Sequence, residues 1–267
     1  MVESIHMDDQ TSKQNNRYDL IDTLRGLEII SMIAFHTCWL LNHFGLGIST
    51  EILFGTAFTV WERSICIGFI LIAGFSFRFG HRHLRKGLLV FGCGAIITLV
   101  TCLFLPQIRI VFGVLTLIGT ASLLMIPIDR ALEDKVNGSV KFDLAGALIS
   151  LLLFIADYNI NKGYIGFMPG AAIQLPAAMY KGYLMTFLGF MEPGFFSTDY
   201  FSLLPWIFVY ACGYFLHIPV ISWQRTREYI KHGIPGISAI GRHSLPIYMV
   251  HPIIIYAVLY LIAQYLL

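Results

Sequence analysis

Charged residues are scarce in this chain. Only 13% of its 267 residues are Asp, Glu, Lys or Arg, whereas 57% are hydrophobic. A soluble domain has about a quarter charged residues and about half apolar ones. The composition therefore excludes an ordinary soluble protein and predicts an all-α polytopic membrane protein embedded in a lipid bilayer. The formal net charge of +2 gives no indication of a nucleic-acid partner.

The chain also lacks a cysteine framework. Its five cysteines show no disulfide pattern and no spacing that suits a metal ion, so no metal cofactor is expected. All five fall in apolar segments, where they are expected to be small buried hydrophobic side chains. Internal repeats are lacking as well, which argues mildly against a transporter built from inverted repeats. The first apolar stretch is too long and too charged for a cleavable signal peptide.

Seven apolar segments are candidates for membrane spans, since a span needs about 20 mostly apolar residues. They are 19–43, 52–77, 84–105, 108–128, 143–158, 200–217 and 241–265, and the fifth is the shortest. Residues 1–16 are predicted to form a polar tail ahead of a single membrane domain over residues 17–267. Most Lys and Arg residues fall on the side of the N-terminus, which predicts a cell-membrane protein with a cytoplasmic N-terminus and an outside C-terminus.

One long connection, residues 160–199, interrupts this series of spans on the predicted outer side. It is rich in glycine, proline and aromatic residues. Loops of this length are usually functional, and the aromatic content argues against disorder. The sequence therefore predicts a folded outer cap or a re-entrant element.

The first span carries ionisable side chains that a hydrocarbon environment disfavours, by roughly 2.5–3.5 kcal/mol for a charged group. On a helix that turns by about 100° per residue, an eleven-residue step returns to within about 20° of its start. Arg25 and His36 are separated by this step, and Asp22 and His43 fall near the same line. One helix face thus presents a polar path. A neutral imidazole on this face, His36 above all, can act as a general base or carry an acyl group. His43 is explained equally well by a functional role and by a position at the membrane–water interface.

A basic cluster follows the second span. It comprises Arg78, Arg82, Arg85 and Lys86 in the segment RFGHRHLRKG. A positive-inside anchor explains such a cluster. An anion site explains it too, because Arg82 and Arg85 lie three residues apart at a predicted helix start, where phosphate is favoured. A cytoplasmic cofactor with several phosphates would fit this site.

Four further residues are candidates for binding a substrate. They are Asp199, Arg109, His251 and Trp206. Asp199 opens the sixth span and is either a helix cap or a binding residue. Arg109 sits at a predicted outer helix start, against the preference of the helix dipole, which suggests Asp199 or a substrate anion as its partner. His251 is equally well explained by a structural hydrogen bond and by a place in a cavity wall.

Four segments in order resemble a known family. They are RYDLIDTLRGLEIISMIAFH, IRIVFGVLTLIGTASLL, STDYFSLLPW and GRHSLPIYMVHP. The chain resembles the bacterial branch of the heparan-alpha-glucosaminide N-acetyltransferase catalytic-domain family, which is related to the wider transmembrane acyltransferases. The resemblance covers about residues 17–256.

The resemblance implies a multi-span acetyltransferase that moves an acetyl or other acyl group from cytoplasmic acyl-CoA to a sugar hydroxyl or amine outside. Arg25 and His36 match the basic residue and catalytic histidine of the wider acyltransferases, and Arg82 and Arg85 match their Arg-x-x-Arg pair, implicated in acyl-CoA binding. Lysosomal members have asparagine at the position of His36, with the active histidine further on, so His43 stays an alternative. The resemblance thus implies acetyl-CoA as donor and an extracytoplasmic carbohydrate as acceptor.

Two hypotheses of other classes fit the same residues. A solute or proton-coupled transporter would use the polar face of the first span as its path, and it would move its substrate without consuming acyl-CoA. A non-catalytic membrane subunit would use the polar groups only to hold its helices together. The sequence also leaves open whether the protein forms a homodimer.

Overall fold

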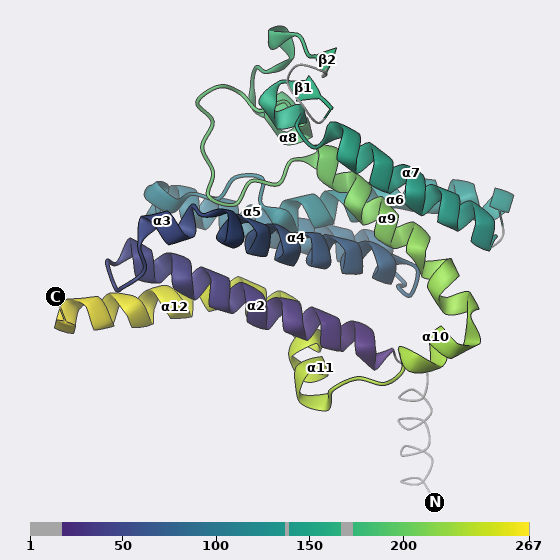
Figure 1. The fold of residues 1–267 in the computed structure, drawn as a ribbon, viewed down its shortest axis with the longest axis horizontal. Coiled ribbons are helices and arrows are strands. Elements are labelled where there is room, and N and C mark those ends of the chain that lie inside the picture. Colours follow the sequence, from purple (N-terminus) through teal and green to yellow (C-terminus); the bar gives the residue numbers. More distant parts are fainter. Residues whose placement is uncertain (1–17, 137–138, 167–172, 267) are drawn as a thin grey trace, which may run out of the picture. The chain divides into compact units, whose positions relative to one another are not determined.

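Figure 1 shows a computed structural model of the chain, which describes residues 18–136, 139–166 and 173–266. The predicted polar tail, residues 1–16, lies outside the described residues. The chain divides into two compact units. The first contains the residues up to 65 together with those from 220 onward, and the second contains residues 66–219. Helix α4, Thr56–Phe77, passes from the first unit into the second.

The first unit is built around one long helix. Its elements are α2 (Asp19–His43), α3 (Thr50–Leu53), the start of α4, α10 (Gln224–Tyr229), α11 (Pro235–Arg242) and α12 (Ser244–Leu266). Both α11 and α12 pack on α2, although about 200 residues separate them from it in the sequence. The first unit therefore joins the two ends of the described chain.

The second unit holds the remaining helices and the long connection. Its elements are the rest of α4, α5 (His83–Phe104), η1 (Pro106–Ile108), α6 (Val114–Val136), α7 (Val140–Asp157), η2 (Ile160–Lys162), β1 (Tyr164–Ile165), β2 (Ile173–Gln174), η4 (Ala177–Met179), α8 (Tyr183–Leu188) and most of α9 (Leu203–Ser222). β1 pairs antiparallel with β2, Tyr164 opposite Gln174. The described part of the connection predicted as an outer cap or re-entrant element thus contains short folded elements.

Six helices of the described ranges are long and apolar enough to cross a membrane: α2, α4, α5, α6, α9 and α12. The prediction of an all-α polytopic membrane protein is confirmed. The fifth predicted span is helical as α7, but it is not among the six. Lys141, Asp143 and Asp157 give α7 three charged residues.

The contacts of the second unit nevertheless favour a crossing by α7. The segments 108–113 and 196–201 are hydrogen-bonded to each other, with Thr198 N–H donating to the Arg109 carbonyl at 3.1 Å and Phe201 N–H to the Phe112 carbonyl at 2.9 Å. Both segments must then lie on one side of a bilayer. Since α6 leaves that side, a second helix has to return before residue 196, and α7 is the helix between them.

Several predicted span boundaries differ from the helices observed, and two of these differences have a local cause. The segment predicted from 108 becomes helical only at Val114, because Phe112 has a positive φ of 58° that interrupts the chain direction before the helix. The last predicted span, 241–265, contains a break at His243 between α11 and α12. Pro246 lies in the first turn of α12, where the missing proline N–H costs no helical hydrogen bond. The five cysteines are free, yet Cys212 alone among them is buried and Cys102 is exposed, which corrects the expectation that all are buried.

Reciprocal glycines allow close approach of helix backbones, as is common in membrane helix pairs. Between α2 and α11, a Cβ on Gly26 would meet the Ile237 carbonyl, and a Cβ on Gly241 would meet the Asp22 carbonyl. The same arrangement joins α4 to α9, where Gly74 faces the Tyr210 carbonyl. These glycines fix which helix faces meet.

We expect Gly241→Ala to destabilise the α2–α11 pair. The added Cβ would overlap the Asp22 backbone, and overpacking of this kind costs about 1–3 kcal/mol. The measurement is the thermal unfolding temperature of the purified protein in detergent. Gly236→Ala is the matched control, because it lies in the same helix and its Cβ would meet nothing within 4 Å. Equal unfolding temperatures for the two variants would contradict the close-packing account.

Candidate functional site

The first unit brings two histidines of distant sequence together. The rings of His36 on α2 and His251 on α12 lie with their centroids 5.1 Å apart and at an angle of 57°. His36 is half-buried and His251 is only 6% exposed. The sequence predicted both residues as candidates but gave no reason to pair them. The pairing brings together one imidazole from α2 and one from α12.

His251 has one nitrogen occupied and one without a partner. Its Nδ1 lies 3.1 Å from the Ile247 carbonyl oxygen, one turn earlier on α12. A carbonyl can only accept, so Nδ1 carries the proton of the neutral ring and Nε2 carries a lone pair. Nε2 is buried and has no hydrogen-bond partner within the described part of the chain. The Tyr248 ring also contacts this imidazole, with the two ring centroids 5.7 Å apart.

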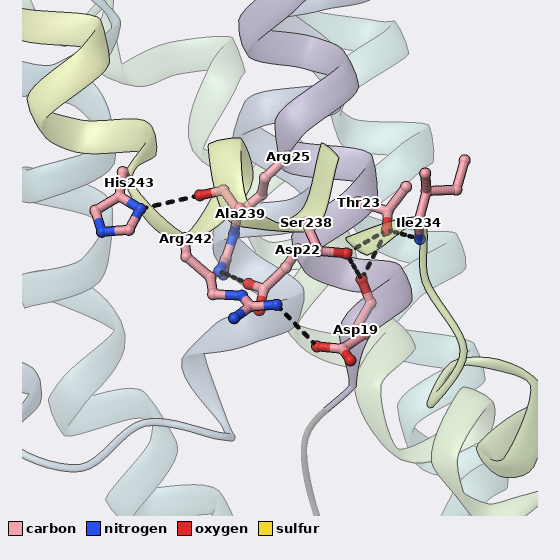
Figure 2. Close-up of polar contacts among 9 residues, drawn as sticks. All are labelled: Asp19, Asp22, Thr23, Arg25, Ile234, Ser238, Ala239, Arg242 and His243. Carbon is pink, nitrogen blue, oxygen red and sulfur yellow. Dashed lines mark hydrogen bonds and ion pairs between the residues drawn. The ribbon is translucent and has the colours of Figure 1, made fainter. Parts of the chain in front are cut away.

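Asp22 and Arg25 belong to a cluster where α11 crosses α2 (Figure 2). The Asp22 carboxylate lies 3.3 Å from the Arg25 guanidinium and 4.0 Å from that of Arg242 on α11. The second guanidinium also lies 3.9 Å from the Asp19 carboxylate. Asp22 is 5% exposed and is thus held between two cations. This cluster fixes the orientation of the N-terminal end of α2 with respect to α11.

Hydroxyl groups complete this contact in Figure 2. Thr23 Oγ1 and Ser238 Oγ are hydrogen-bonded to each other at 2.7 Å, and each oxygen also lies within hydrogen-bond distance of the Asp19 carbonyl, at 2.9 and 3.1 Å. The N–H of Ile234, the residue before α11, donates to Thr23 Oγ1 at 3.0 Å. Arg242 and Ser238 were not predicted as part of the site. The segment GRHSLP that contains Arg242 was noted, but only the fold shows that it meets Asp22.

His43 lies in a different environment from His36. It is exposed in the last turn of α2, where its ring stacks on Trp39 at 5.9 Å and meets the edge of Phe44 at 5.2 Å. Aromatic neighbours of this kind suit the interfacial role that the sequence allowed. Of the two histidines on the polar face of α2, His36 is the one that contacts another imidazole.

The structure separates Arg78 from the rest of the predicted basic cluster. Its guanidinium lies 2.9 Å from Asp143 of α7, which is 2% exposed, and 4.2 Å from the centre of the Tyr214 ring on α9. The Tyr214 hydroxyl donates in turn to Asp129 of α6 at 2.6 Å. Arg78 therefore ties four helices together. The sequence did not predict this network, in which the Arg78 guanidinium is paired with a buried carboxylate.

We expect Asp143→Ala to lower the free energy of unfolding by about 3–5 kcal/mol, because it leaves the Arg78 charge buried without its carboxylate. Thermal unfolding in detergent measures the loss. Asp157→Ala is a matched control on the same helix, since Asp157 is half-buried and makes no ion pair within the described ranges. A double variant, Arg78→Leu with Asp143→Leu, should recover most of the stability, and failure to do so would contradict the pairing.

The other three basic residues of the cluster are exposed. Arg82, Arg85 and Lys86 lie at the start of α5, and Arg82 is its N-cap with a left-handed backbone, φ 60° and ψ 46°. That conformation turns the chain sharply between α4 and α5. The free N–H groups of the helix start and the two guanidinium groups offer donors on one short segment, as a phosphate requires.

Arg109 and Asp199 lie on the two hydrogen-bonded segments of the second unit. Asp199 accepts from the N–H of Val114, the first residue of α6, at 3.3 Å, and so caps α6 instead of the helix that follows it in the sequence. The Arg109 Nε donates to the Phe196 carbonyl at 3.0 Å. Arg109 also precedes the start of α6 by five residues, so the predicted clash with a helix dipole does not arise.

Trp206 is enclosed by aromatic neighbours. It is 3% exposed, and its ring centroid lies 4.8 Å from that of Phe201 and 5.4 Å from that of Phe154. Nearby, burial raises the pKa of Tyr200 to about 12, so its hydroxyl stays neutral and donates to the Thr186 carbonyl at 2.6 Å. Trp206 therefore packs inside the second unit among aromatic rings.

The described residues contain no group of three or more His, Cys, Asp or Glu side chains that could hold a metal ion. A comparison with protein families gives one match. The model for heparan-alpha-glucosaminide N-acetyltransferase, catalytic, matches residues 17–253. The chain belongs to this family. Neither a curated protein nor a solved structure was found to match the chain.

Membership of the heparan-alpha-glucosaminide N-acetyltransferase family supports a membrane acetyltransferase in general. With six candidate spans, the protein is a multi-pass membrane protein. The family match begins just before α2 and ends within α12, so it includes both histidines of the imidazole pair and both arginines at the start of α5.

Proposed function

We propose that the protein transfers an acetyl group, or another acyl group, from cytoplasmic acyl-CoA to a hydroxyl or amine of a carbohydrate on the extracytoplasmic side. The observation that carries the proposal is the imidazole pair of His36 and His251 in a chain of an acetyltransferase family. An imidazole in apolar surroundings is the side chain best suited to take a proton at neutral pH and return it.

The donor is bound through its phosphates at the start of α5. Arg82, Arg85 and Lys86 are exposed there, and the proposal assigns the phosphates to these three residues and not to the ion-paired Arg78. Guanidinium groups bind phosphate oxygens through charge-assisted hydrogen bonds, and the helix dipole adds to the attraction. The cytoplasmic side of this segment follows from its positive charge.

His36 acts as the general base. It removes the proton from the acceptor O–H or N–H while the acceptor oxygen or nitrogen bonds to the acetyl carbon. The bond from that carbon to the CoA sulfur then breaks, and the proton passes from the imidazolium to the thiolate, which leaves as CoA-SH. Arg25 and Asp22 orient the cytoplasmic end of α2 through their ion pair.

The acceptor binds at the outer side, where the second unit presents the segment of Arg109 and Asp199. Arg109 is anchored by one hydrogen bond to Phe196 and keeps further N–H groups for an acceptor. The proposal places this segment outside because a cytoplasmic N-terminus and seven crossings, α7 included, bring it there. The C-terminus then lies outside as well.

Proteoliposomes with purified protein test this proposal. Acetyl-CoA is added on one side and glucosamine, as a probe acceptor, is enclosed on the other, and CoA thiol release and N-acetylglucosamine are measured together. Equal amounts of both products, formed only in this arrangement, are the expected result. Movement of glucosamine across the membrane without release of CoA would overturn the proposal and favour the transporter. No binding of acetyl-CoA by folded protein would exclude the proposed donor.

A further inference from the structure

We propose that His251 is a positioning residue for His36. The His251 Nε2 atom accepts a hydrogen bond from the N–H of the His36 ring. This inference rests on the proposed acetyl transfer, in which His36 is the base. The sequence offered His251 only as a structural or substrate-binding residue. The contacts of α12 with α2 point to a more specific role.

The first step is the fixed orientation of the His251 ring. Its Nδ1–H donates to the Ile247 carbonyl within the same helix, so the ring is held by its own backbone and does not depend on a ligand. The lone pair of the neutral ring is therefore on Nε2 in the resting protein. The side chain is 6% exposed, and no second hydrogen bond competes for that lone pair within the described residues.

The second step is the missing donor. A buried acceptor without a partner costs about 1–3 kcal/mol, so such an atom normally has a donor in the working protein. The His36 ring lies against it, with centroids 5.1 Å apart. Because each ring nitrogen lies about 1 Å from its centroid, this separation permits a hydrogen bond of about 3 Å once the His36 ring turns toward Nε2.

The third step is the effect on the reaction. A neutral imidazole has one N–H and one lone pair, so a base free to exchange its tautomers spends part of its time with the N–H toward the acceptor, where a lone pair is needed. When the His36 N–H donates to His251, the other nitrogen of the His36 ring, which carries the lone pair, faces the acyl acceptor. The same hydrogen bond strengthens when His36 becomes an imidazolium. A carboxylate performs this task in soluble triads, whereas a neutral imidazole avoids the cost of a carboxylate inside a membrane.

Three variants of His251 separate these contributions. His251→Asn keeps a donor for the Ile247 carbonyl but has no acceptor at the Nε2 position. His251→Gln reaches that position with its amide oxygen and restores an acceptor. His251→Phe keeps the ring and removes both polar atoms. All three are first checked for a single peak in size exclusion and for an unchanged unfolding temperature.

We expect His251→Asn and His251→Phe to lower kcat about 100-fold, with the KM values for acetyl-CoA and for the probe acceptor within about threefold of the parent. His251→Gln should regain about tenfold of that loss. An independent readout is the ¹⁵N spectrum of His36 in histidine-labelled protein, assigned by comparison with His36→Gln. The parent should show one tautomer, and His251→Asn a mixture of two.

The results distinguish the inference from the function on which it rests. An unchanged kcat together with an unchanged His36 spectrum in the Asn and Phe variants overturns the positioning role. A raised KM for the acceptor with unchanged kcat overturns it too, because His251 would then bind the acceptor. If the parent transfers no acetyl group but its His36 spectrum still responds to His251→Asn, the contact stands and the proposed function fails. If one variant does not fold, the other supplies the same readouts.

Discussion

Replacement of His36 by alanine is expected to lower kcat for acetyl transfer by about 10²–10⁴-fold, the usual contribution of a general base. The protein should still fold, because the imidazole meets Phe35 edge-on and lies tilted against His251, and its side chain makes no hydrogen bond within the described residues. The measurement is CoA thiol release in the proteoliposome assay, at acetyl-CoA concentrations that saturate the donor site. KM for acetyl-CoA should change little.

His43→Ala is the matched control for this variant. It removes an imidazole from the same helix face, seven residues further on, where the side chain is exposed and stacks on Trp39. We expect its kcat within about threefold of the parent, as for a surface residue outside the reaction. The opposite ranking, with His43→Ala inactive and His36→Ala active, would transfer the role of base to His43. Full activity of both variants would contradict the proposal that a histidine of α2 is the general base.

The paired substitution Arg82→Ala and Arg85→Ala is expected to weaken acetyl-CoA binding by about 10–100-fold. Each guanidinium is exposed at the start of α5, and loss of a charge-assisted hydrogen bond to phosphate costs on the order of 1 kcal/mol or more at such a site. Calorimetry in detergent measures Kd for acetyl-CoA. The affinity of the parent should fall with rising salt, because exposed charges are screened.

A second exposed basic pair provides the control for net charge. Arg225→Ala with Arg227→Ala removes two cations from α10, also on the predicted cytoplasmic side. Its Kd for acetyl-CoA should match that of the parent. If both double variants weaken binding equally, a general positive potential and not a built phosphate site attracts the donor. If neither does, the cluster at the start of α5 serves only to orient the protein in the membrane.

The sequence alone determined the class of the protein and most of its helices. Insertion into a bilayer depends on the length and polarity of each segment by itself, so the spans that became α2, α4, α5 and α9 were predicted within a few residues. The polar face of α2 was likewise predicted, because residues eleven apart on one helix must share a face. The ordered motifs of the chain also sufficed to indicate its family, which the match to residues 17–253 bears out.

The tertiary structure alone decided which polar groups meet. Nothing in the spacing of His36 and His251, of Arg78 and Asp143, or of Asp22 and Arg242 indicates a contact, since each pair joins helices far apart in the sequence. These contacts depend on which faces of two helices pack together. The glycine positions determine those faces, because two helix backbones approach closely only where there is no side chain between them. The sequence therefore listed the ionisable residues, but only the packing distinguishes Arg78, which is held in an ion pair with a buried carboxylate, from Arg82 and Arg85, which are exposed.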